Sequence, residues 1–81
     1  MPVRRYKKKP REVDAIQYLD NPEEVADFVR VRVQEQEGEL LIYTSDGTMH
    51  VQEGFYIVKG TYGGYYSCDP ELFESRFEEI K

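Results

Sequence analysis

Glycine-containing turns at short intervals are the feature that most restricts what this chain can fold into. In residues 37–68, short runs of β-branched and aromatic residues are separated by glycines at positions 38, 47, 54, 63 and 64. Runs of about four to eight such residues between turn residues are typical of antiparallel strands. The second half of the chain is therefore predicted to form paired strands.

The Asp46-Gly47 pair predicts a hairpin between residues 40–44 and 48–52, because a type I′ turn needs positive φ at both central positions. This turn sets a predicted register of three pairs: Thr44 opposite Met49, Tyr43 opposite His50, and Ile42 opposite Val51. In this register one face is apolar and is assigned to the core. Its members are Leu40, Ile42, Met49 and Val51.

A second hairpin is predicted between residues 55–62 and 65–68, with its turn at Gly63-Gly64. It places Tyr62 opposite Tyr65, and residue 61 opposite Tyr66. These three tyrosines surround a flexible turn beside Lys59, and tyrosine is enriched in binding sites. Lys59, Tyr62, Tyr65 and Tyr66 are therefore the candidate binding residues, although cross-strand packing in a small core would use the same side chains.

The first half of the chain predicts a strand over residues 12–19, followed by a helix. In the strand, Val13 and Ala15 fall on one face and Ile16 and Tyr18 on the other, as expected for a strand covered on both sides.

The helix is predicted to begin after an Asn21 N-cap with Pro22 at its first position, and to end near Arg30. Its buried face contains Val25, Phe28 and Val29. A further strand is predicted over residues 31–36.

A C-terminal helix is predicted after an Asp69 cap, with a buried stripe of Phe73, Phe77 and Ile80. The complete order is β-α-β-β-β-β-β-α. The predicted fold class is α+β: a mainly antiparallel sheet, made of two hairpins and N-terminal strands, with two short helices packed on one face. Residues 1–11 are predicted to form a basic N-terminal arm, and residues 12–81 a single α+β domain.

The distribution of charge separates this arm from the rest of the chain. The net charge is −5, but all sixteen acidic residues lie from Glu12 onward, where five basic residues remain and the net charge is −11. An acidic body favours a basic protein partner over nucleic acid. The arm predicts phosphate or nucleic-acid contact, or a solvated tail that leads into the first strand. Its candidate contacts are Arg4, Arg5, Lys7, Lys8 and Lys9.

Catalytic and metal chemistry is not expected. His50 is the single histidine and Cys68 the single cysteine, whereas metal sites need several clustered ligands. Cys68 precedes a helix N-terminus, which favours a thiolate, but a nucleophile also needs a base, and nothing connects His50 to it. No cofactor is predicted, and the glycines at 60, 63 and 64 fit a hairpin turn better than a phosphate loop.

The sequence shows neither a signal peptide nor an apolar run long enough to span a membrane. A soluble protein of the bacterial cytoplasm is therefore expected.

Two segments of the chain have a distinctive pattern: residues 6–18 read YKKKPREVDAIQY, and residues 54–78 read GFYIVKGTYGGYYSCDPELFESRFE. Together they resemble a family of small proteins that bacteriophages and prophages encode. The sequence departs from the family pattern at Glu53, Phe55 and Ser67. The resemblance implies a phage or prophage accessory protein and implies no catalytic residue.

Three functions are compatible with these features. The first is a non-enzymatic protein that binds a host or defence protein, or itself as a homo-oligomer that covers strand edges. The second is a nucleotide-binding sponge, in which the tyrosines stack on a base and Lys59 with the arm holds phosphate. The third is a nucleic-acid binder that uses the arm.

Overall fold

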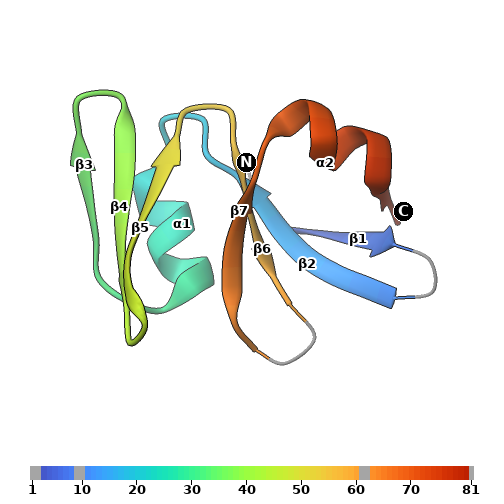
Figure 1. The fold of residues 1–81 in the computed structure, drawn as a ribbon, viewed down its shortest axis with the longest axis horizontal. Helices are drawn as coiled ribbons and strands as arrows, with labels where there is room; N and C mark the ends of the chain where they lie inside the picture. The colour runs from blue at the N-terminus through green and yellow to red at the C-terminus, as the bar shows by residue number, and fades with distance from the viewer. Residues whose placement is uncertain (1–2, 9–10, 61–62, 81) are drawn as a thin grey trace.

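The computed structural model describes residues 3–8, 11–60 and 63–80, which form two antiparallel sheets and two helices (Figure 1). The larger sheet has the strand order β7-β6-β2-β1-β8, and the smaller has the order β3-β4-β5. The larger sheet contains β1 (Arg4–Lys8), β2 (Arg11–Gln17), β6 (Tyr56–Lys59), β7 (Tyr65–Cys68) and β8 (Glu78–Glu79). The smaller sheet contains β3 (Val33–Gln36), β4 (Glu39–Thr44) and β5 (Gly47–Gln52), and the helices are α1 (Pro22–Val29) and α2 (Pro70–Arg76).

The α+β class and the predicted order of elements are confirmed, and the structure adds one strand at each end of that order. β1 lies within the segment predicted as an arm. It pairs with β2 on one side and β8 on the other, so residues 4–8 are not a solvated tail. The apolar contact between the rings of Tyr6 and Phe73, whose centroids are 4.8 Å apart, attaches this basic strand to the core.

The central strand β2 is covered on both faces, as its sequence predicts. Ile16 and Tyr18 pack in one cluster with α1 and the smaller sheet, and Val13 and Ala15 pack in a second cluster under α2. The two helices therefore cover opposite faces of the larger sheet rather than one face. The first cluster also contains Val25, Val29, Leu40, Ile42, Val51 and Ile57; the second also contains Tyr56, Val58, Phe73 and Phe77.

The β4–β5 hairpin forms, but the predicted register is wrong by two residues. Thr44 lies opposite Gly47, Ile42 opposite Met49, and Leu41 opposite His50. The turn is at residues 45–46, neither of which has a positive φ. It is organised by the Thr44 hydroxyl, which donates to the Gly47 carbonyl at 2.7 Å and accepts from the Asp46 N–H at 3.2 Å. Because a shift of two residues keeps each side chain on its face, the predicted core face is correct.

The β6–β7 hairpin is shorter than predicted and has a longer connection. Lys59 lies opposite Tyr65, and Val58 opposite Tyr66, so the predicted partners of these two tyrosines are wrong. The connection is closed by the Gly60 N–H, which donates to the Gly64 carbonyl at 2.7 Å. Residues 61 and 62, including the candidate Tyr62, lie outside the described residues.

Of the two N-caps predicted from the sequence, one forms and the other does not. Asp69 caps α2 as predicted, because its Oδ1 accepts from the N–H groups of residues 71 and 72 at 2.9 and 3.4 Å. The Asn21 side chain does not cap α1. Its Oδ1 accepts from the Leu19 N–H at 2.7 Å, and its amide donates to the Gln17 carbonyl at 3.2 Å.

The C-terminal apolar stripe is shorter than predicted. Phe73 and Phe77 are buried, but α2 ends at Arg76 and the chain then becomes extended. The Ile80 N–H donates to the Arg5 carbonyl at 3.0 Å, and the Ile80 side chain is exposed. Pairing with β1 therefore replaces the last helical turn.

Phe73 is the centre of the second cluster, and its truncation should be costly. Its ring is fully buried and stacks between Tyr56 and Phe77, with centroid distances of 3.9 and 4.6 Å. We expect Phe73→Ala to lower the free energy of unfolding by about 3–5 kcal/mol, measured by urea denaturation. Leu72→Ala, at the adjacent exposed position, should change it by less than about 0.5 kcal/mol. Equal losses in the two variants would contradict this assignment of the core.

Candidate functional site

His50 and Cys68, the two residues with potential for nucleophilic chemistry, lie on different sheets. His50 is exposed on β5, where its Nδ1 is 2.9 Å from Oε1 of Glu39. Cys68 ends β7 and is half-buried against the second core cluster. In the part of the chain that the structure describes, no group of three or more His, Cys, Asp or Glu side chains is placed to hold a metal ion.

The basic residues of β1 lie among carboxylates. Arg4 Nη1 is 2.6 Å from Oε2 of Glu79, and this hydrogen bond and the adjacent charge raise the pKa of the Arg4 guanidinium. Arg5 Nε is 3.4 Å from Oδ1 of Asp14.

The β1 register extends this pattern along the strand. Lys7 lies opposite Glu12 in β2 and opposite Glu78 in β8. Lys8 is the last residue of β1, and Lys9 lies outside the described residues. Arg4 and Arg5 are therefore balanced by carboxylates within the fold, which reduces what these two side chains can offer to phosphates.

The structure does not bring Tyr65 and Tyr66 together as one cluster. They are adjacent in β7 and therefore point to opposite faces of the sheet. Tyr65 points toward α1, where its hydroxyl donates to the Phe28 carbonyl at 3.2 Å and its ring meets that of Phe28 edge-on at 5.7 Å. Tyr66 is 44% exposed on the other face.

We use the name β7 edge surface for three features taken together: the outer edge of β7, the exposed Tyr66 side chain and the exposed Leu72 side chain. β7 is the end strand of the larger sheet and pairs only with β6 among the described strands. Leu72, in α2, is 45% exposed. Burial raises the pKa of the Tyr66 hydroxyl, and the nearby Cys68 thiol raises it further. The charge of Arg76 opposes this shift. Tyr66 lies on the α2 face of the sheet, because its cross-strand partner Val58 belongs to the cluster under α2.

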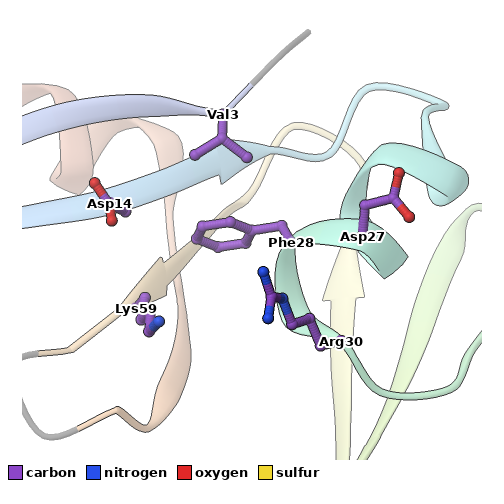
Figure 2. A pocket seen from close by; sticks show the side chains of 6 residues that line it. All are labelled: Val3, Asp14, Asp27, Phe28, Arg30 and Lys59. Carbon is purple, nitrogen blue, oxygen red and sulfur yellow. The ribbon is translucent and has the colours of Figure 1, made fainter.

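Lys59 belongs to a different surface, a hollow of about 390 Å³ between β2, β6 and α1 (Figure 2). Among the described residues, the aromatic side chain that lines this hollow is Phe28, and neither Tyr65 nor Tyr66 lines it. The remaining lining residues are Val3, Asp14, Asp27 and Arg30.

The residues of these two surfaces that are absent from the predicted set include Leu72, Phe28 and Arg30. The sequence could have indicated Leu72, because a leucine that lies off the buried i, i+4 stripe of Phe73 and Phe77 is expected to be an exposed apolar residue. It could also have indicated Arg30, since Arg30 follows a helix at a position that usually takes glycine. It could not have indicated Phe28, because the helical face of Phe28 matches that of the core residues.

No family model, no curated protein and no solved structure matches the chain. The resemblance to phage-encoded proteins therefore stays a prediction. In the described residues, neither helix is long and apolar enough to cross a membrane.

Two further tyrosines, both buried, donate hydrogen bonds to exposed carboxylates. The Tyr18 hydroxyl donates to Glu35 at 3.1 Å, and the Tyr56 hydroxyl donates to Glu74 at 3.2 Å. Burial, and then the hydrogen bond to the neighbouring carboxylate, raise the pKa of each phenol from 10.0 to about 12. Both hydroxyls are therefore hydrogen-bond donors at neutral pH.

These two phenols should make stability depend on pH in alkaline solution. The folded chain holds both protons more tightly than the unfolded chain, so the stabilisation is complete below pH 10 and is lost as pH rises from 10 to about 12. We expect urea denaturation to show this decrease, and the double variant Tyr18→Phe, Tyr56→Phe to show a smaller one. Equal decreases in both proteins would contradict the role of these phenols.

Proposed function

We propose that this chain is a non-enzymatic binding protein, encoded by a phage or prophage, which engages a host or defence protein in the bacterial cytoplasm. The β7 edge surface is its site of contact. The partner supplies an extended segment that pairs with β7 and an apolar side chain that packs on Tyr66 and Leu72.

The outer edge of β7 is the observation that supports this proposal most: among the described strands only β6 is hydrogen-bonded to β7, and β5 of the smaller sheet approaches β7 without pairing with it. Exposed edges usually carry charges or are very short, because an open edge invites pairing with another chain. β8, at the opposite end of the same sheet, has two residues, and both are glutamates. β3, at one edge of the smaller sheet, includes Glu35. β7 (YYSC) and β5 (GTMHVQ), the other edge of the smaller sheet, both lack Asp, Glu, Lys, Arg and Pro, and we place the contact on β7 because it carries the exposed Tyr66.

The side chains beside this edge suit a protein partner. Tyr66 and Leu72 are each more than two-fifths exposed, and tyrosine is enriched among residues that dominate binding energy. Because the pKa of Tyr66 is raised, its hydroxyl stays protonated at neutral pH and is able to donate a hydrogen bond.

The charge around the surface favours a basic partner over a second copy of this chain. Asp69, Glu71 and Glu74 are exposed at and within α2, beside Leu72. Each copy carries a net charge of −5, so two copies repel each other. A basic host protein is attracted by the same field. Nucleic acid is the weaker alternative, because Arg4 and Arg5 already pair with carboxylates.

Lysine substitutions on the β7 edge surface should test the proposal. We expect the wild-type chain to capture one dominant protein from bacterial lysate. Tyr66→Lys and Leu72→Lys should each weaken the affinity of the chain for this purified partner by about tenfold or more. Val31→Lys is the matched control, because Val31 is an exposed apolar residue away from this surface, and it should leave affinity unchanged.

Two results would overturn the proposal. One is a partner whose affinity is equal for the wild type and both surface variants. The other is a wild-type chain that sediments as a dimer without a host partner, and that Tyr66→Lys converts to a monomer. Circular dichroism of each variant should confirm that the substitutions leave the fold intact.

A further inference from the structure

The hollow beside Lys59 lies apart from the β7 edge surface, and its lining combines one aromatic ring with four charged side chains. It is open to solvent and has a volume of about 390 Å³. Figure 2 shows the Phe28 ring projecting into the middle of the hollow, with Arg30 extending beside it toward the side where Lys59 lies. An apolar ring and two cations are thus presented together.

Both cations in the hollow are available to a ligand. Within the described residues, the side chains of Arg30 and Lys59 have neither an ion pair nor a hydrogen bond, and both residues are exposed. The two carboxylates are placed differently. Asp14 lies opposite Lys59 in the β2–β6 pairing, but its Oδ1 is 3.4 Å from Arg5 Nε, and in Figure 2 the Asp27 carboxylate points away from Lys59. The side of the hollow with Arg30 and Lys59 therefore favours an anion.

The Phe28 ring is held in position by its surroundings. Tyr65 contacts it edge-on, with centroids 5.7 Å apart, and the Tyr65 hydroxyl donates to the Phe28 carbonyl. A ring that is already fixed loses little entropy when a planar group stacks on it. Tyr65 thus contributes to this hollow through Phe28 rather than as a contact of its own.

Arg30 occupies a backbone conformation that arginine does not favour. Its φ is 58°, and its N–H donates to the Ala26 carbonyl at 2.8 Å to end α1. Glycine is the usual residue at this position, because the left-handed region strains residues that carry a Cβ. An unfavourable residue whose side chain reaches a hollow is a pointer to function.

From these observations we infer that the hollow binds a small ligand with a planar ring and a phosphate group, of the nucleoside monophosphate class. The ring stacks on Phe28, and the phosphate is held by Arg30 and Lys59. Arginine supplies forked donors to phosphate oxygens, and lysine supplies a mobile point charge.

The test is an NMR titration of the full chain with adenosine monophosphate. We expect saturable shifts of the backbone amide signals of Phe28, Arg30 and Lys59. Adenosine and inorganic phosphate, which each supply half of the ligand, should bind at least about tenfold more weakly. If phosphate alone binds as tightly as the nucleotide, the ring has no role and the inference is overturned.

Arg30→Gly is the decisive variant, because it removes the guanidinium while placing a favoured residue at this φ. It should preserve or raise the midpoint of thermal unfolding and weaken nucleotide binding by about tenfold or more. Lys59→Gln should also weaken binding.

Glu37→Gly is the matched control, because Glu37 also has a positive φ of 44° but lies outside the hollow. It should leave binding unchanged. Binding that is equal in the wild type and in Arg30→Gly, or no binding by the wild type, would overturn the inference. Neither result bears on the β7 edge surface, whose variants leave the hollow intact.

Discussion

The two-sided burial of β2 is the constraint on which the rest of the structure depends. One face of this strand supplies Ile16 and Tyr18 to the cluster under α1, and the other supplies Val13 and Ala15 to the cluster under α2. A chain of 81 residues has little apolar surface to bury, and β2 contributes side chains to both core clusters at once. β1 and β6 must then flank β2, which sets the order of the larger sheet.

Features written in local sequence could be predicted, and features that depend on distant pairing could not. The faces of β2 and the Asp69 cap follow from residues that are neighbours in the chain, and both are confirmed. The strand β1 reads as a solvated basic segment by itself. It becomes a strand only because β2 and β8 pair with it. The predicted helical stripe included Ile80 for the same reason. The helical spacing of Phe73, Phe77 and Ile80 is a local pattern, whereas the pairing with β1 that makes this segment extended is not.

The candidate site shows the same division. Tyr65, Tyr66 and Lys59 were selected because they are close in sequence around one turn. In a strand, however, adjacent residues point to opposite faces. This alternation separates Tyr66, on the α2 face, from Tyr65, which contacts Phe28 of α1. Lys59 shares its hollow with Phe28 of α1, about thirty residues earlier, and no local pattern indicates that this helix lies beside it.

The position of β8 has a consequence for the order of events during synthesis. β8 pairs with β1 through Tyr6 and Glu79, near opposite ends of the chain, and Arg4 is joined to Glu79 by a short ion pair. The N-terminal strand therefore leaves the ribosome long before its outer partner exists. Until then its exposed side lacks hydrogen bonds, and closing so long a loop is slow. The lysines and arginines of β1 repel identical strands on neighbouring nascent chains, which protects β1 from aggregation until β8 has been made.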